Sequence, residues 1–224
     1  MSSQDDKLSP PSFLHRLLKH LSLDWVSLAL DLINYLRRIL CSKSSGPYEN
    51  LDYEVTLELL DTIGKTAVFR KRQRVKFLQD NMIAFEDYAW GDGEILSNYK
   101  CVPGVVVDKY REGDRWNILI SLRESKSSGD IEEFHIERTE KNTFVKAEEW
   151  LQTEIRQHTH RLRMNVILPN KRRCQRAVLV QRKSNRAIVL GAEHIRSLPD
   201  GRQLLSWETN HVQAYNIYTL KWLW

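Results

Sequence analysis

The sequence has few of the residues that build disulfide-rich, zinc-knuckle or collagen-like proteins. Its 224 residues include three cysteines, Cys41, Cys101 and Cys174, which lie far apart and form no CxxC pair. A disulfide framework or a structural zinc site needs paired or clustered cysteines. Neither is therefore expected, and a reducing cytoplasm is the predicted compartment. Nine glycines and six prolines are too few for a collagenous or wholly unfolded chain.

The motifs of phosphate-binding loops and serine hydrolases are also missing. The sequence contains no GxxxxGK[ST], GxGxxG or GxSxG, the arrangements that direct backbone N–H groups at phosphate or expose a nucleophilic serine. The N-terminus lacks the basic and apolar regions of a secretory signal. No residue is marked as catalytic and no cofactor is expected. A hydrolase or transferase with an unrecognised site is the third-ranked alternative.

Residues 13–41 have the spacing of an amphipathic helix. Large apolar residues recur at alternating intervals of three and four positions, which is typical of one helix face. These residues are Leu14, Leu18, Leu21, Trp25, Leu28, Leu32, Tyr35 and Ile39. Asp24 and Asp31 would each cost about 2 to 3 kcal/mol near a bilayer centre, so a transmembrane span is disfavoured. We expect the apolar face to self-associate, to dock on a protein partner or to contact a membrane surface peripherally.

The composition changes on both sides of this predicted helix. Residues 1–12 are polar and contain two consecutive prolines, so a flexible leader is expected there, and residues 42–47 (SKSSGP) predict a linker. From residue 48 the apolar period changes from about 3.6 to about 2, which indicates β-strands. The alternation is clearest at residues 53–59, 116–122, 162–168 and 215–224, whereas residues 144–157 fit a helix or a strand.

Hairpins are expected where two alternating segments flank a turn. One joins residues 105–110 to 116–122, and another joins 174–181 to 187–190. Without regular β–α–β alternation, this pattern predicts a mainly β domain at residues 48–224, either an antiparallel β-sandwich or a partly open barrel. Two small β subdomains divided near residues 125–130 are the alternative.

Positive charge is unevenly distributed along the chain. The formal net charge is +5, and ten Lys or Arg residues lie between Glu154 and Glu193 with no acid among them. Strand arginines can bind phosphates, but they can equally pair with acids on neighbouring strands of the same domain. The candidate anion-binding or nucleic-acid-binding residues are Arg70, Arg72, Arg74, Lys76, Arg161, Arg163, Arg172, Arg173 and Arg176.

His158 and His160 are the nearest approach to a metal-ligand pair. On a strand they would share a face and could bind an ion together with a carboxylate such as Glu154. Arg156 and Arg161 would repel that ion, and a typical site needs three or four ligands, so no metal is expected. The favoured function is a non-catalytic binding or adaptor module with the helix as its docking element. A nucleic-acid-binding protein that uses the basic strand faces is the second alternative.

Overall fold

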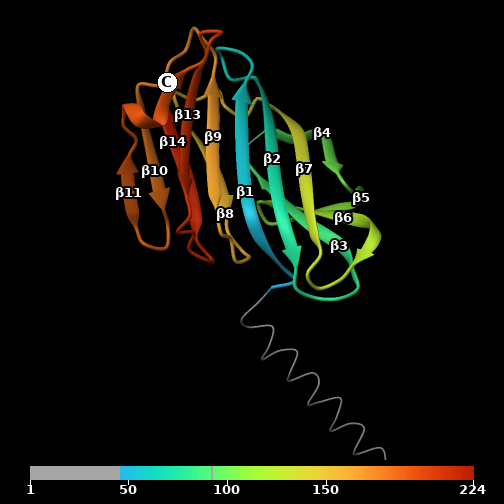
Figure 1. The fold of residues 1–224 in the computed structure, drawn as a ribbon. Coiled ribbons are helices and arrows are strands. Elements are labelled where there is room, and N and C mark those ends of the chain that lie inside the picture. The colour runs from blue at the N-terminus through green and yellow to red at the C-terminus, as the bar shows by residue number, and fades with distance from the viewer. Residues whose placement is uncertain (1–45, 92) are drawn as a thin grey trace, which may run out of the picture. The chain divides into compact units, whose positions relative to one another are not determined.

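The computed structural model describes residues 46–91 and 93–224, which belong to the compact unit Ser45–Trp224 (Figure 1). This part of the chain is mainly β, as the period of two predicts. The leader, the helix at 13–41 with its apolar face, and residues 42–45 of the linker lie outside the described residues. The described elements are β1 (Tyr48–Leu59), β2 (Thr66–Phe77), β3 (Met82–Trp90), β4 (Glu94–Val102), β5 (Val105–Glu112), β6 (Arg115–Lys126), β7 (Ile131–Lys141), β8 (Glu148–Glu154), β9 (Leu162–Leu168), β10 (Arg176–Gln181), β11 (Arg186–Val189), η1 (Ala192–His194), β12 (Ile195–Ser197), β13 (Gln203–Thr209) and β14 (Ile217–Leu223).

The strands form three sheets, all open in the part of the chain described. The large sheet has seven strands in the order β12-β13-β9-β1-β2-β7-β4. The C-terminal sheet has four, β11-β10-β14-β8, and the middle sheet has three, β3-β6-β5. In the large sheet the end strands β12 and β4 do not pair with each other, so the sheet does not close into a barrel.

One strand pair departs from the antiparallel arrangement expected from the sequence. β1 and β9 run parallel, with Tyr53 opposite Leu162 and Glu58 opposite Ile167, whereas the other named strand pairs are antiparallel. Short hairpin loops force adjacent strands to be antiparallel, but a long connection leaves the direction free. The expectation of a wholly antiparallel fold was therefore wrong at this pair, because strands β2 to β8 separate its two members.

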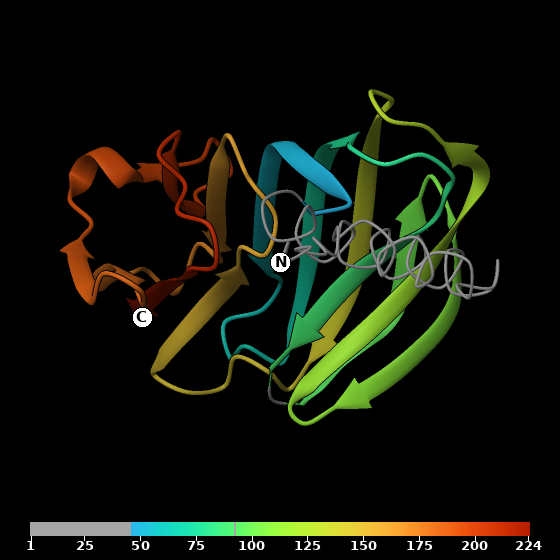
Figure 2. The ribbon, with the colours of Figure 1, turned by 90° about the horizontal axis from the view of Figure 1, so that it is seen from below.

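Both smaller sheets pack on the same face of the large sheet. The inward side chains of β2 contribute to both hydrophobic cores: Ala67 and Phe69 pack in one, and Val75 and Phe77 in the other. Figure 2 shows β1, β2 and β7 in one layer and β3, β6 and β5 in the other. Within the described residues, no element covers the opposite face of the large sheet.

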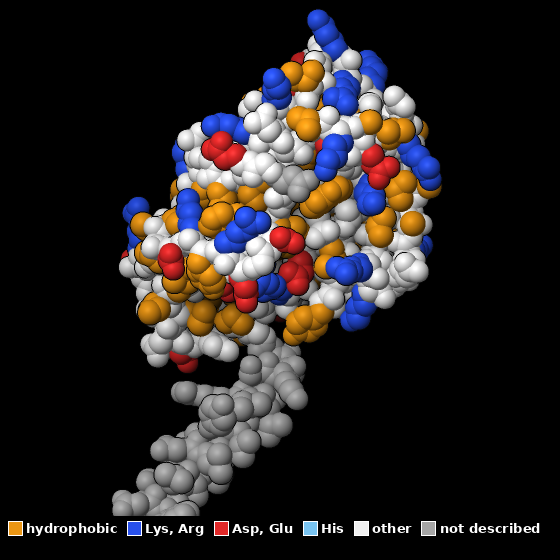
Figure 3. All heavy atoms as spheres, turned by 180° about the vertical axis from the view of Figure 1, so that it is seen from behind, with side chains coloured by type: hydrophobic (Ala, Val, Ile, Leu, Met, Phe, Trp, Pro, Cys, Tyr) orange, Lys and Arg blue, Asp and Glu red, His pale blue; other side chains and the backbone are white. Residues whose placement is uncertain are grey.

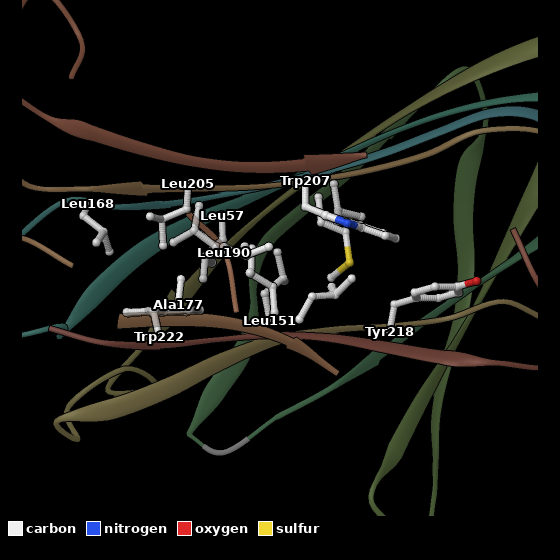
Figure 4. Packing of buried hydrophobic residues seen from close by; sticks show 14 of the residues in the cluster. Leu57, Leu151, Leu168, Ala177, Leu190, Leu205, Trp207, Tyr218 and Trp222 are labelled. Atoms are coloured by element: carbon white, nitrogen blue, oxygen red, sulfur yellow. The ribbon is translucent and has the colours of Figure 1, made fainter. Parts of the chain in front are cut away.

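The C-terminal strand is central to the first core. β14 lies between β10 and β8, with hydrogen-bonded registers on both sides. Tyr218, Leu220 and Trp222 are at most 1% exposed, and Figure 4 shows Tyr218 and Trp222 in the layer opposite Leu205 and Trp207. The packed terminal strand predicted from its aromatic alternation is confirmed. In the ambiguous segment at residues 144–157, Glu148–Glu154 form the neighbouring strand β8, and the residues on either side of it are not in a strand or helix.

Asp61 stabilises the turn between β1 and β2. Its carboxylate accepts hydrogen bonds from the backbone N–H groups of Ile63 (3.0 Å), Lys65 (3.0 Å) and Thr66 (2.8 Å). Burial opposes ionisation, but these bonds hold the pKa of Asp61 below its ordinary value.

We therefore expect Asp61→Ala to lower the free energy of unfolding by about 1 kcal/mol at neutral pH. A depressed carboxyl pKa contributes stability that is present above the ordinary pKa and is lost as pH falls through the lowered one. The difference between wild type and variant in urea unfolding should accordingly shrink as the solution is made acidic. Asp61→Asn is the control, since its side-chain oxygen still accepts a hydrogen bond. A difference that does not change with pH would contradict this account.

Candidate functional site

The open face of the large sheet carries the first predicted basic strip. Alternation directs Arg70, Arg72, Arg74 and Lys76 of β2 away from the core residues Phe69 and Val75. β2 lies between β1 and β7, and both neighbours present carboxylates on the same face. The geometry therefore favours ion pairs across the strands.

Most of this strip is paired with those carboxylates. Arg70 contacts Glu58 at 2.6 Å and Glu137 at 2.9 Å. Arg72 contacts Asp52, Glu54 (3.2 Å) and Glu133 (3.3 Å), and Lys76 lies 3.8 Å from Glu49. Arg74 is exposed and forms no ion pair within the described part of the chain. Positive charge on this face is largely balanced by the adjacent strands.

Arg161 and Arg163 belong to the second predicted strip and are also paired. Both contact Glu208 of β13, at 3.0 and 2.7 Å. Arg163 in addition lies 3.7 Å from Glu54, which also contacts Arg72. The structure thus brings members of the two strips to one carboxylate.

Arg172, Arg173 and Arg176 lie apart from that face. Arg172 donates to the carbonyl oxygens of Thr62 (2.9 Å) and Lys146 (3.4 Å), and its guanidinium lies 3.7 Å from the ring centroid of Trp224. It holds two loops to the end of the chain. Arg173 and Arg176 are exposed and, within residues 46–224 other than 92, form no ion pair.

The outer side of the C-terminal sheet combines exposed apolar residues with such free basic residues. Trp150 is 37% and Val189 is 63% exposed. We call this surface the outer C-terminal face. Its apolar residues are Trp150, Val178, Val180, Val189, Ile217 and Leu223. Five exposed basic residues come from β10, β11 and the loops on either side of β10, and none has an ion pair in the described part of the chain: Lys171, Arg173, Arg176, Arg182 and Arg186.

Strand register places apolar residues of this face near one another, with Lys221 between two of them. Val178 lies opposite Val189 on one side and Lys221 on the other, and Lys221 lies opposite Trp150. Figure 3, which views the molecule from behind, shows hydrophobic side chains exposed among lysines and arginines. Contiguous exposed apolar area rimmed by charge is typical of protein-binding surfaces.

A cluster of buried charged residues, which we did not predict from the sequence, lies where the two cores meet. Lys71 forms an ion pair with Asp87, and their side chains are 5% and 0% exposed. The hydroxyl of Tyr99 donates to Asp87 Oδ2 at 2.7 Å. Arg138 pairs with Glu140 at 2.9 Å, and both are about equally buried. We call these five residues the buried charge cluster.

Lys71 and Asp87 each shift the pKa of the other toward the charged form. Burial opposes the charge on Asp87, but Lys71, Arg138 and the Tyr99 hydroxyl hold its pKa below the ordinary value. Burial also opposes the charge on Lys71, but Asp87 holds its pKa above the ordinary value. Burial raises the pKa of Glu140 despite the nearby Arg138.

The cavity beside this cluster contains about 50 Å³ of free space, with Tyr53, Arg138 and Trp90 in its lining. That volume accommodates a few water molecules, whereas pockets for organic ligands are typically about 300 to 1,000 Å³. One guanidinium nitrogen of Arg138, Nη1, is buried without a hydrogen-bond partner among the described residues. The arrangement therefore suits an internal water or a small acceptor rather than an organic substrate.

Glu154, the carboxylate expected beside the histidine pair, contacts Arg156 instead, at 3.0 Å. The carboxylate beside His158 and His160 is that of Glu49. The sequence did not indicate this residue because it lies 109 positions before His158.

Comparisons with known proteins give little further guidance. The chain matches no protein-family description and no curated protein sequence. Among solved structures it is similar to an M1 zinc metallopeptidase from Deinococcus radiodurans and to a point mutant of that enzyme, each with a TM-score of 0.48 and 8% identity. Each alignment covers 78% of this chain but 42% of the peptidase chain. Similarity at this level is uninformative about function.

Proposed function

We propose that residues 46–224 form a non-catalytic binding module that recognises an acidic protein surface through the outer C-terminal face. One contrast carries the proposal. Arg70, Arg72 and Lys76 on the large sheet pair with carboxylates of the same sheet. By contrast, Arg173, Arg176 and Arg186, on β10, β11 and the loop before β10, are exposed and have no ion-pair partner among the described residues. Unpaired basic residues around an apolar centre favour a partner with acidic residues around its own apolar centre, because each buried charge then gains a counter-charge.

The predicted helix at residues 13–41 completes the proposal as an element for self-association or docking. A leucine-rich face with Trp25 near its middle is too apolar to be left in water. Within residues 46–91 and 93–224, no helix has the length and hydropathy needed to span a membrane. A cytoplasmic location stays a prediction from the cysteine pattern.

Affinity capture from an extract of the source organism tests the binding surface. We expect the triple variant Arg173→Glu, Arg176→Glu and Arg186→Glu to retain each partner at least about tenfold less than wild type, a loss of about 1.4 kcal/mol. The matched control is Lys100→Glu, Arg123→Glu and Arg196→Glu, which makes the same change in net charge at exposed positions elsewhere. The control should retain its partners.

Two outcomes would contradict the proposal. Equal capture by the triple variant and by wild type would remove the outer C-terminal face from the binding surface. Tight binding of duplex DNA or single-stranded RNA that weakens steeply with salt would instead support the nucleic-acid alternative. The basic residues that meet at Glu54, Arg72 and Arg163, would then be the ones to substitute in a nucleic-acid-binding assay.

A further inference from the structure

Glu49 at the start of β1 forms a cluster of potential metal ligands with His158 and His160. His160 Nε2 lies 3.0 Å and His158 Nδ1 lies 3.5 Å from Glu49 Oε2. One ligand atom from each residue lies within 4.8 Å of the other two. Ligand atoms about 2.0 to 2.2 Å from a tetrahedral ion are themselves about 3.4 Å apart. From this geometry we propose that the three residues bind a divalent transition-metal ion such as Zn²⁺.

The backbone holds the three ligands in place before any ion binds. The Asn50 N–H donates to the His158 carbonyl oxygen at 2.8 Å, and the His160 N–H donates to that of Asn50 at 2.9 Å. The parallel bridge between Asn50 and Thr159 therefore fixes the loop to β1. Because His158 and His160 are two positions apart on extended backbone, their side chains fall on the same side.

Buried side chains behind the site reinforce this bridge. Asn50 and Thr159 are each 3% exposed. The Asn50 amide donates to the Thr159 hydroxyl at 2.9 Å and accepts from Gln73 at 2.6 Å. The Thr159 hydroxyl donates to the carbonyl oxygen of Gln157 at 2.9 Å. These bonds fix the backbone next to each of the three ligands, so less ordering is needed when an ion binds.

Nearby positive charges are largely occupied elsewhere. Arg156 pairs with Glu154 and lies over the ring of Tyr88 at 4.3 Å, and Arg161 pairs with Glu208. Lys76 is the charge that opposes a cation, 3.8 Å from Glu49 Oε1. It approaches the oxygen that the histidines do not contact, so Oε2 remains available. The flanking arginines, which in the sequence argued against a metal, therefore repel an ion at this site less than their number suggests.

The donor atoms select the class of ion. Two imidazole nitrogens and one carboxylate oxygen suit Zn²⁺, Co²⁺, Ni²⁺ or Cu²⁺, whereas Ca²⁺ and Mg²⁺ prefer oxygen alone. Three protein ligands leave a fourth position for water or for a ligand atom from a partner. The His158 and His160 side chains are 65% and 50% exposed, so an ion can reach the site from solvent.

Titration of the full chain with Co²⁺, followed by visible absorption, tests the site, with Zn²⁺ competition and calorimetry as the second readout. We expect one saturable Co²⁺ per chain with intense tetrahedral bands that Zn²⁺ abolishes. His160→Ala and Glu49→Gln should each weaken binding at least tenfold. The matched control His135→Ala removes an exposed histidine that also contacts a glutamate, Glu133 at 3.0 Å, and should bind as wild type does.

Specific results would overturn the site. If Co²⁺ does not bind saturably, the proposed site does not exist. If the Co²⁺ spectra are unchanged in both His160→Ala and Glu49→Gln, the ion is held by other residues of the chain. Circular dichroism of each variant checks that it folds. Should Glu49→Gln misfold, His158→Gln is the replacement, because the His158 side chain is more exposed and its contacts are with the other two proposed ligands, Glu49 and His160.

Discussion

Removing residues 217–224 is expected to abolish cooperative unfolding of the β unit. The deletion takes β14 out of the middle of the C-terminal sheet, so β8 and the β10–β11 hairpin lose their common partner. It also removes Tyr218, Leu220 and Trp222 from the first core. Large aromatic core residues cost about 3 to 5 kcal/mol each when truncated, against a total stability of about 5 to 15 kcal/mol. The losses from this strand therefore exceed what the unit can sustain.

A single substitution gives the same test in graded form. Trp222→Ala should lower the free energy of unfolding by about 3 to 5 kcal/mol in urea. Trp150→Ala is the matched control, because Trp150 lies on the outer side of β8 and is 37% exposed while Trp222 is 1% exposed. The control should lose well under half as much. A deletion variant that melts cooperatively at the wild-type temperature, or equal losses in the two tryptophan variants, would exclude this role for β14.

Local alternation was enough to predict much of the fold. Strands with one buried and one solvent-exposed face repeat every two residues, so β1, β6, β9 and β14 were visible in the sequence. The β5–β6 and β10–β11 hairpins followed because a turn and two alternating segments lie close together in the chain. The parallel pairing of β1 with β9 was not predictable, since it joins segments about a hundred residues apart.

The same limit explains which parts of the candidate sites were missed. Alternation directs Lys71 to the inward face of β2 between Phe69 and Gln73. That placement was the one available signal of a buried charge, because a lysine on a core face needs a partner. Its partner Asp87 lies on another sheet, and no spacing in the sequence connects the two. Glu49 was missed for the same reason.

The ion pairs of the large sheet show a different kind of limit. Basic and acidic segments were both visible, and pairing between them was one of two explanations considered for the strips. Only the strand order distinguishes the two explanations, because the basic side chains of β2 are neutralised by carboxylates on its neighbours β1 and β7. The sequence alone does not distinguish the unpaired arginines of the outer C-terminal face from the paired arginines of the large sheet, because both kinds lie in strongly basic segments.

Breaking the Lys71–Asp87 pair from one side is expected to lower the free energy of unfolding by about 3 to 5 kcal/mol. Lys71→Met leaves the carboxylate of Asp87 buried without its main counter-charge, and Asp87→Leu leaves the ammonium of Lys71 in the same position. Removing both charges together avoids that penalty. The double variant should therefore be much closer to wild type than either single variant, a large positive coupling.

An exposed pair provides the control for this cycle. Lys141 and Glu94 are also a lysine and a carboxylate, 3.6 Å apart, but their side chains are 50% and 61% exposed. Water solvates each member after the other is removed, so Lys141→Met and Glu94→Gln should each leave the urea midpoint close to that of wild type. Equal coupling in the two cycles would show that burial is not the cause.

The buried pair also predicts a pH dependence at both ends of the range. The depressed pKa of Asp87 gives stability that is present above the ordinary aspartate value of 3.8 and is lost as pH falls through the lowered pKa. The elevated pKa of Lys71 gives stability that is present below the ordinary lysine value of 10.5 and is lost as pH rises through the raised pKa. Wild-type stability should thus fall at acidic and at alkaline pH relative to the double variant, which lacks both groups. Urea unfolding of the two proteins across that range measures the difference in their free energies of unfolding. A difference that stays constant at every pH would mean that Lys71 and Asp87 do not carry opposite charges at the junction of the cores.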